Sequence, residues 1–429
     1  MSIGTHEGVM TLGGVHLDQV LERLRRLEPH ARACWIYDVD AFAARVSRLQ
    51  QAAAPLRAVN AYALKANSLP SLLARILAAG LEVDAGSIGE LESARAAGFG
   101  PTRRTLSGNG RTPEEAAWVA REGVAAVSAD SLAELDLLEA AATEHGRIVR
   151  VALRVNPGIG TPGHRHVATG HEGAKFGVSR EEALQAWNVR ARWPHLCVDG
   201  LHLHVGSQLL EREPLVAAAQ LALALARSSA ERGAPLALIN LGGGFGVDYA
   251  EQSDAFPLEM HLAELAELPG AMAFEWRLEP GRWLVAPVGV LLAEVLAVKL
   301  RRDPSGERRF VVLAAGMNDL LRPALYGARH RIVPVRPRAG GQSEATVVGP
   351  VCESGDTFET AALLPPLEVG DVVALLDTGA YGAVMSSNYN GRPRLAELVI
   401  DGGRLRRARR GEMPSELLAR ATDDPLDSA

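Results

Sequence analysis

The stretch "AYALKANSLPSLL", from Ala61 to Leu73, joins an apolar run to an amphipathic helical segment through a short turn. One lysine, Lys65, stands where the apolar run ends. An apolar run followed at once by a helical segment is the building unit of an α/β protein. Whether this unit repeats along the chain therefore decides the fold.

The unit repeats through roughly 250 residues, the usual size of a barrel of eight such units. Short runs rich in Val, Ile and Leu end in Gly, Asn or Ser, and a longer, alanine-rich helical segment follows each. The expected strands are 57–65, 82–85, 104–107, 125–128, 149–156, 198–205, 237–241 and 274–279. This pattern predicts a (β/α)8 TIM barrel, because the alternative, an open doubly wound sheet, usually has fewer strands.

The rest of the sequence follows a different pattern. After the barrel, runs such as "FVVLAAG" and "DVVALLD" are separated by turns and carry few helical windows. They predict an all-β, Greek-key-like domain over 286–429. Residues 1–38 hold one helical segment and the strand "CWIYD", and we assign them to the β domain. The barrel is then expected over 39–285.

Composition excludes several classes of protein. The 429 residues carry a formal net charge of -6 and one basic run, 404–410, which we interpret as a solvated strand edge, so no nucleic-acid partner is predicted. Three widely spaced cysteines argue against a disulfide framework and a metal site. They favour a reducing, cytoplasmic setting. No segment predicts a signal peptide or a membrane span.

The barrel gives Lys65 a possible role, because the carboxyl ends of barrel strands surround the site of chemistry. A lone lysine there is commonly a solvated cap, so other strand ends must support the role. The sixth strand ends in "GLHLHVGSQ". We expect only one of its histidines to face the barrel mouth, and His204, close to Ser207, is the candidate. The alternative is a buried structural histidine.

The last two strands end in motifs that suit an anionic cofactor. "NLGGGFG", residues 240–246, is either a tight turn or a loop whose N–H groups bind phosphate, and it does not match the register of a dinucleotide site. "LEPGRW" then adds the carboxylate of Glu279. A lysine, an imidazole, a phosphate loop and a carboxylate together suggest pyridoxal 5'-phosphate, with a Schiff base to Lys65 and Glu279 facing the pyridine nitrogen.

These residues carry a resemblance to a known family. Across nearly its whole length the chain resembles the fold-type III (alanine-racemase-like) PLP-dependent decarboxylases, and most closely the diaminopimelate decarboxylase family. The shared motifs are "YALKANS", "DAGSIGELESARAAGF", "LSGNGRT", "GLHLHVGSQ", "NLGGGFG", "LEPGRW", "GMNDLLRPALYGARH", "CESGDTF" and "GAYGAVMSSNYNGRPR".

The resemblance implies a role for each matching residue. The cofactor residues would be Lys65 as the Schiff-base lysine, His204 stacked on the ring, Ser207, Gly243 and Gly244 on the phosphate, and Glu279 at the pyridine nitrogen. The substrate residues would be Arg282, Arg322 and Tyr326 on the carboxylate that does not react, with Tyr381 close to the cofactor. Cys352 and Glu353 would come from the second subunit of a homodimer with shared active sites.

The implied activity is the decarboxylation of the amino acid meso-2,6-diaminopimelate to L-lysine. A substrate amine would displace Lys65, CO₂ would leave, and the ring would take up the remaining charge. Cys352 is our first candidate for the acid that returns the proton, because a thiol near a cation has a lowered pKa. A water molecule or the released Lys65 is the alternative donor, and Cys352 would then be a small buried residue.

Two departures from the family pattern leave the substrate open. Arg329 stands where the family pattern has tyrosine, and Ala315 precedes the glycine of "GMND". The rivals are an amino-acid racemase, a sibling decarboxylase and a PLP-binding homeostasis protein. Glu279 argues against the racemase, whose cofactor nitrogen usually faces an arginine, and the β domain argues against the homeostasis protein. Arg322 argues only against siblings that act on ornithine or arginine, not against those that use a siderophore intermediate or a carrier-tethered amino acid.

Overall fold

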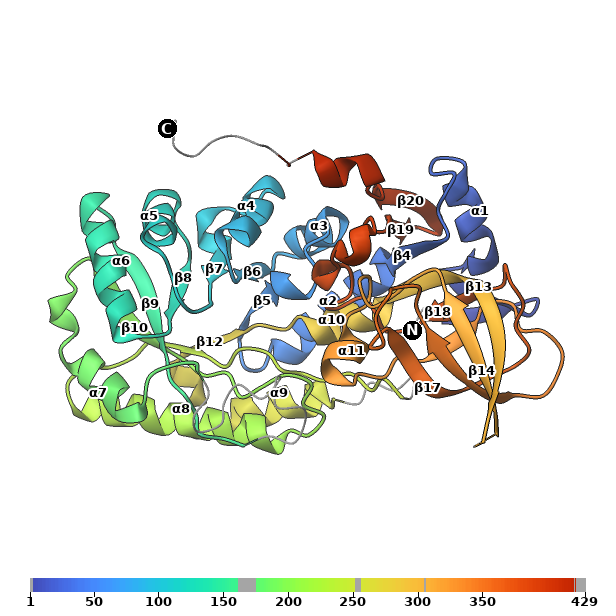
Figure 1. The fold of residues 1–429 in the computed structure, drawn as a ribbon. Helices are drawn as coiled ribbons and strands as arrows, with labels where there is room; N and C mark the ends of the chain where they lie inside the picture. The colour runs from blue at the N-terminus through green and yellow to red at the C-terminus, as the bar shows by residue number, and fades with distance from the viewer. Residues whose placement is uncertain (1–2, 161–174, 251–255, 305, 420, 422–429) are drawn as a thin grey trace. The chain divides into compact units, whose positions relative to one another are not determined.

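The computed structural model describes residues 3–160, 175–250, 256–304, 306–419 and 421 (Figure 1). The chain divides into two compact units. One unit is Phe42–Ala286, and the other combines Met1–Ala41 with Pro287–Ala429.

The first unit is a closed barrel of eight parallel strands, which confirms the predicted (β/α)8 fold. The strands follow one another in chain order around the barrel, and the last pairs with the first. They are β5 (Val59–Ala63), β6 (Glu82–Ala85), β7 (Arg104–Leu106), β8 (Ala126–Ala129), β9 (Val149–Arg154), β10 (Leu196–His202), β11 (Leu238–Asn240) and β12 (Glu275–Leu278). All eight expected strands are present, and several are shorter than predicted.

Helices follow the barrel strands and lie outside them, as α4, α5 and α6 do in Figure 1. Several begin at a residue whose hydroxyl accepts a hydrogen bond from the backbone three positions on, as at Ser87, Thr112 and Ser131, which satisfies one of the free N–H groups of the first turn. The helices are α2 (Val39–Ala53), α3 (Pro70–Ala78), α4 (Ile88–Ala96), α5 (Pro113–Glu122), α6 (Leu132–Glu144), α7 (Arg180–Asn188), α8 (Glu213–Glu231), α9 (Leu258–Glu267) and α10 (Arg282–Val285).

The barrel interior is closely packed where β9 and β10 meet. Ala126, Ala152 and Leu238 form a buried cluster, and Gly200 lies against it. A Cβ at Gly200 would come within 2.8 Å of the Ala152 Cα, so only glycine fits this approach of two strands. The interior is therefore filled, and the chemistry is left to the strand ends.

The second unit is built on a nine-stranded sheet and confirms the predicted β domain. The N-terminal strand β4 lies inside this sheet, antiparallel to β13 and parallel to β19. The sheet strands are β4 (Ala33–Asp38), β13 (Gly289–Asp303), β14 (Gly306–Leu313), β15 (Ile332–Pro334), β16 (Ser343–Val348), β17 (Thr357–Leu364), β18 (Val372–Leu375), β19 (Glu397–Asp401) and β20 (Arg404–Arg409). Two helices, α1 (Val20–Arg25) and α11 (Arg322–Tyr326), belong to the same unit.

A small sheet that the sequence did not predict completes the core of this unit. It consists of β1 (Ile3–His6), β2 (Val9–Leu12) and β3 (Val15–His16). Leu12 of β2 and Leu21 of α1 are buried with Ile36 and Leu292 of the large sheet in one apolar cluster. Residues of β2, β3 and α1 are thus part of the core because their apolar side chains pack against this sheet.

The basic run forms the edge strand β20, as predicted. Its side chains are largely exposed, and Arg407 and Arg409 pair with Glu28 and Glu397 at 3.0 and 2.5 Å. Of the helices in the described part of the chain, none combines the length and apolarity that a membrane crossing needs.

Candidate active site

Lys65 lies just beyond the first barrel strand. Strand β5 ends at Ala63, two residues earlier than predicted, and Lys65 is in the short 3₁₀ helix Leu64–Ala66 that follows. Its side chain is exposed although both neighbours are buried. The Lys65 ammonium contributes to the pKa of Asp84, Glu90, His202 and His204, so its charge lies close to all four groups.

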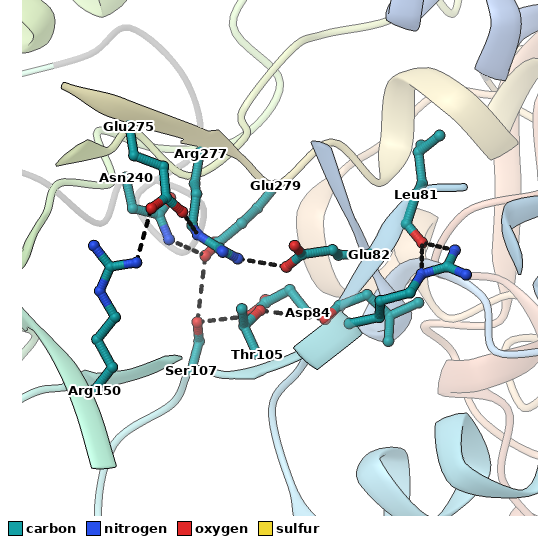
Figure 2. Close-up of polar contacts among 12 residues, drawn as sticks. Leu81, Glu82, Asp84, Thr105, Ser107, Arg150, Asn240, Glu275, Arg277 and Glu279 are labelled. Atoms are coloured by element: carbon teal, nitrogen blue, oxygen red, sulfur yellow. Dashed lines mark hydrogen bonds and ion pairs between the residues drawn. The ribbon is translucent and has the colours of Figure 1, made fainter. Parts of the chain in front are cut away.

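Glu279, just after β12, is the centre of a buried polar network (Figure 2). Its carboxylate is 6% exposed. The Asn240 amide at the end of β11 donates to Oε1 at 2.7 Å, and the Ser107 hydroxyl beyond β7 lies 3.4 Å from the same oxygen. The His202 Nε2, at the end of β10, lies 3.7 Å from Oε2. Four strand ends thus converge on one carboxylate.

A second carboxylate, Asp84 at β6, joins this network through Ser107 (Figure 2). It is 2% exposed and accepts hydrogen bonds from Ser107 at 2.7 Å and Thr105 at 3.1 Å. Burial and then the nearby Glu279 raise the pKa of Asp84 to about 8, although Lys65 and the two hydroxyls act in the opposite direction. Asp84 therefore holds a proton at neutral pH. The Ser107 hydroxyl lies within hydrogen-bonding distance of both Asp84 and Glu279 and so connects them, with its single hydrogen donated to one of the two at a time.

Charged groups from further down the barrel wall also appear in Figure 2. The Arg277 guanidinium of β12 pairs with Glu82 of β6 and with Glu275 at 2.9 Å, and Arg150 of β9 reaches Glu275 at 2.7 Å. Arg150 also pairs with Asp199, so each of the two guanidinium groups forms ion pairs with two carboxylates. This network ties strands together and leaves the reactive role to the groups around Glu279.

The expectation that only one of the two histidines faces the barrel mouth is wrong. Residues two positions apart in a strand do not alternate faces, and β10 ends at His202, so the pleat does not separate the two rings, and Lys65 lies close to both. Removal from water lowers the pKa of both rings well below the usual value, and Lys65 and Arg154 lower it further. Both are thus neutral imidazoles near Lys65, and the His202 Nε2 lies 3.7 Å from the Glu279 Oε2.

The glycine loop after β11 is shaped by close contacts that exclude side chains. A Cβ at Gly243 would lie 2.2 Å from the Glu279 carbonyl oxygen. Gly244 has a φ of +102°, and its Cβ would lie 2.5 Å from the Gly206 oxygen. Within the described residues, the N–H groups of Gly243 and Gly244 have no hydrogen-bond acceptor. Amides left without an acceptor are rare, so this loop suits an anionic ligand.

Arg282 lies beside the same loop. It is 7% exposed, and its guanidinium donates to the Ser207 hydroxyl at 3.0 Å and to the Tyr249 hydroxyl at 2.9 Å. Ser207 follows Gly206, which touches the glycine loop. Surface ion pairing, the alternative for Arg282, is excluded by this burial. The barrel therefore offers an amine, a carboxylate and an anion site, which are the three groups that pyridoxal phosphate requires.

The other residues predicted for the substrate, Arg322, Tyr326 and Tyr381, belong to the second unit. Arg322 begins α11, is 4% exposed and donates through Nη1 to the His330 Nε2 at 2.8 Å, so it too is no surface ion pair. Tyr326 ends the same helix and is half-buried. Tyr381 is half-buried and has a φ of +56°, an uncommon conformation for a residue with a side chain.

Two further predicted residues, Cys352 and Glu353, are exposed in this unit, and so is Arg329, which departs from the family pattern. The Cys352 backbone N–H donates to the Asn390 side chain at 2.9 Å, and the Glu353 carboxylate accepts from the Tyr389 hydroxyl at 3.5 Å. Arg329, which replaces the tyrosine of the family pattern, is exposed and pairs with Glu359 at 2.8 Å. Its charge is therefore neutralised within its own unit.

The sequence interpretation missed Asp84, Ser107 and Asn240, and it set His202 aside. Each is a polar residue at or just beyond the carboxyl end of a barrel strand, in "EVDAGS", "TLSGNG", "LINLGG" and "GLHLH". That position was the available signal, because such residues surround the reaction site of a barrel. Their contacts with Glu279 could be found only in the folded chain.

A comparison with known families assigns this site to a class. Residues 39–286 match the family described as pyridoxal-dependent decarboxylase, pyridoxal binding domain. The chain belongs to the pyridoxal-dependent decarboxylases, and pyridoxal phosphate is its cofactor.

Within that class the chain is similar to diaminopimelate decarboxylases. That of Zymomonas mobilis is 35% identical over 389 residues, which cover 90% of this chain and 91% of the relative. The crystal structure of diaminopimelate decarboxylase from Helicobacter pylori, complexed with L-lysine, has a TM-score of 0.85 at 34% identity and covers 92% of this chain and 98% of that one. The crystal structure of diaminopimelate decarboxylase from M. jannaschii, in co-complex with L-lysine, has a TM-score of 0.90 at 28% identity and covers 99% of this chain and 98% of that one.

Proposed function

We propose that the protein decarboxylates meso-2,6-diaminopimelate to L-lysine and CO₂, a reaction of lysine biosynthesis. The observation that carries this proposal is the match to curated diaminopimelate decarboxylases across about nine-tenths of both chains. Two solved relatives are complexed with L-lysine, the product of this reaction. The barrel contributes the groups that such a reaction needs.

Each cofactor group has a residue suited to hold it. When bound, pyridoxal phosphate supplies an electron-poor ring that takes up the charge left at the substrate Cα as CO₂ departs. Lys65 supplies the anchoring amine. The amides of Gly243 and Gly244, with Ser207 and Arg282, bind the phosphate, which gives Arg282 a position on the cofactor side rather than on the substrate. His204 would stack on the ring.

Glu279 would face the ring nitrogen, beside a second buried carboxyl group, Asp84. Two carboxylates this close resist a second ionisation, and Asp84 is the one that keeps a proton at neutral pH. Ser107 links the two, and the Asn240 amide fixes one Glu279 oxygen. An anion beside the ring nitrogen favours its protonated form, which is the stronger electron acceptor.

Arg322 and Tyr326 bind the carboxylate of the centre that does not react. A buried guanidinium makes charge-assisted, two-point hydrogen bonds to a carboxylate, and these require a substrate with a second carboxyl group. The family resemblance assigns Tyr381 to the cofactor. Glu353 and Cys352, both exposed in this chain, reach the site of the other subunit in a homodimer, and Cys352 returns the proton to the product.

Three unpaired thiols suit a reducing compartment, and we place the enzyme in the cytoplasm.

The test is a substrate panel on the purified protein loaded with pyridoxal phosphate. The substrates are meso-diaminopimelate, D-ornithine, L-ornithine and L-arginine, and both CO₂ and the amine product are measured. We expect L-lysine from meso-diaminopimelate at a kcat/KM at least about 100-fold above the other three. Arg329→Tyr, which restores the family residue at an exposed position, should leave this order unchanged. Preference for ornithine or arginine would contradict the proposal.

A further inference from the structure

Arg322 is held by a neighbour that no assigned role explains. The Arg322 Nη1 lies 2.8 Å from the His330 Nε2, and the His330 Nδ1 lies 2.9 Å from the carbonyl oxygen of Leu376. Both side chains are 4% exposed. The imidazole therefore stands between a guanidinium and a backbone carbonyl, away from water.

This arrangement determines where the ring proton lies. A backbone carbonyl can only accept a hydrogen bond, so the Nδ1 of His330 carries the hydrogen. A guanidinium can only donate, so the Nε2 of His330 presents its lone pair to Arg322. His330 is thus a neutral acceptor in the tautomer that its neighbours require. A second ring proton would remove the acceptor and place a cation against Arg322.

The position of the imidazole is set by the sheet of the same unit. His330 precedes β15, which pairs with β18, and the Leu376 N–H donates to the Arg331 oxygen at 2.9 Å. Arg331 also donates to the buried carboxylate of Asp377 at 2.6 Å. The two segments that hold the His330 ring are therefore fixed to each other by backbone and side-chain bonds.

We propose that His330 is a positioning residue that orients the Arg322 guanidinium and so determines selectivity for ligands with a distal carboxylate. The inference rests on the proposed function, in which Arg322 binds that carboxylate. His330 engages Nη1 and thereby fixes the plane of the guanidinium. A carboxylate accepts two parallel hydrogen bonds only from a guanidinium in its own plane, so a change of orientation weakens binding.

Two substitutions each keep one of the two hydrogen bonds of the His330 ring and remove the other. In His330→Gln the amide oxygen reaches the Nε2 position and accepts from Arg322, whereas the bond to Leu376 is lost. In His330→Asn the amide nitrogen reaches the Nδ1 position and donates to Leu376, whereas Arg322 loses its acceptor. The pair therefore distinguishes orientation of Arg322 from simple attachment to the sheet.

The measurements are the KM and kcat for meso-diaminopimelate and the inhibition constants of L-lysine and 1,5-diaminopentane. These two inhibitors differ only by the distal carboxylate. We expect His330→Asn to raise the KM and the L-lysine inhibition constant at least tenfold, with kcat and 1,5-diaminopentane inhibition changed less than twofold. In His330→Gln the KM, the kcat and both inhibition constants should stay within threefold of the parent values. Loss of binding alone raises KM without lowering kcat.

The cofactor absorbance and the melting temperature report whether each variant is folded and loaded. If His330→Asn does not fold, His330→Met, which also lacks a comparable acceptor, takes its place in the comparison with His330→Gln. Equal effects of the acceptor-keeping and acceptor-lacking variants would overturn the inference, as would equal weakening of both inhibitors.

Arg322→Ala separates the inference from the function on which it rests. If Arg322→Ala impairs meso-diaminopimelate turnover and His330→Asn does not, His330 has no positioning role and the proposed function stands. If Arg322→Ala has no effect, the distal carboxylate is bound elsewhere, and both the Arg322 assignment and the inference fail.

Discussion

Replacing Asp84 by asparagine should change how the stability of the protein depends on pH. Asp84 is buried with Ser107 and Glu279, and its pKa is raised from 3.8 to about 8. Between those values the folded protein keeps a proton that the unfolded chain has released. The unfolding free energy therefore falls as the pH rises, by at most about 1.4 kcal/mol per pH unit. An asparagine has no such proton, so its contribution is independent of pH.

The magnitude follows from two buffers inside that window. From pH 5.5 to pH 7.5 the contribution of Asp84 lowers the unfolding free energy of the wild type by at most about 2.7 kcal/mol. The unfolding free energy of Asp84→Asn has no such contribution. The stability of the variant relative to the wild type should therefore rise with pH. His202 and His204 have lowered pKa values and give the opposite slope, but both are present in both proteins and cancel in the difference.

The assay is the melting temperature or the denaturant midpoint of both proteins at the two pH values. Glu181→Gln, which removes an exposed carboxylate from the start of α7, is the matched control and should show no pH-dependent difference. In Glu279→Gln the pKa of Asp84 should be lower, because the repelling charge is gone. The unfolding free energy of this variant should therefore fall less steeply with pH than that of the wild type. We expect the stability of Asp84→Asn, measured relative to that of the wild type, to rise with pH. A relative stability that stays constant or falls as the pH rises would refute this account of the two carboxylates.

Three further predictions concern the cofactor and the subunits. Gly243→Ala should weaken pyridoxal phosphate binding at least tenfold in an absorbance titration, because its Cβ would lie 2.2 Å from the Glu279 carbonyl oxygen; unchanged affinity would remove the loop from the site. Arg282→Ala should also weaken cofactor binding with little change in the KM of the loaded enzyme, and the reverse result would return Arg282 to the substrate. Refolding an equal mixture of the inactive variants Lys65→Ala and Glu353→Ala should restore about a quarter of wild-type activity, because half of the dimers are hybrids with one intact site; tagged chains that prove mixing without recovery would exclude a shared site.

The barrel was predictable because its signal is local. Each strand is a short apolar run, a helix follows it before the next strand, and the eight repeats leave few other folds. The small sheet β1–β3 lacked such a signal. Its strands have two to four residues, and their burial depends on contacts with β4 and β13, which lie up to about three hundred residues away in the chain.

The candidate site was predictable only where a motif marks a residue. Lys65, Glu279 and the glycine loop stand in motifs that indicate their chemical roles. Asp84 and Ser107 do not, because an aspartate at a strand end becomes a proton-holding group only when burial and another carboxylate act on it. The prediction that only one of His202 and His204 faces the barrel mouth assumed that the two alternate faces, but residues two positions apart in a strand do not, and β10 ends at His202.

The most direct test of the central claim is the attachment of the cofactor to Lys65. The purified protein, loaded with pyridoxal phosphate, is reduced with borohydride, digested and analysed by mass spectrometry. The account predicts one modified peptide, which contains Lys65, and no modification in Lys65→Ala. A reduced adduct on another lysine, or an unmodified Lys65 in protein that has bound the cofactor, would contradict it.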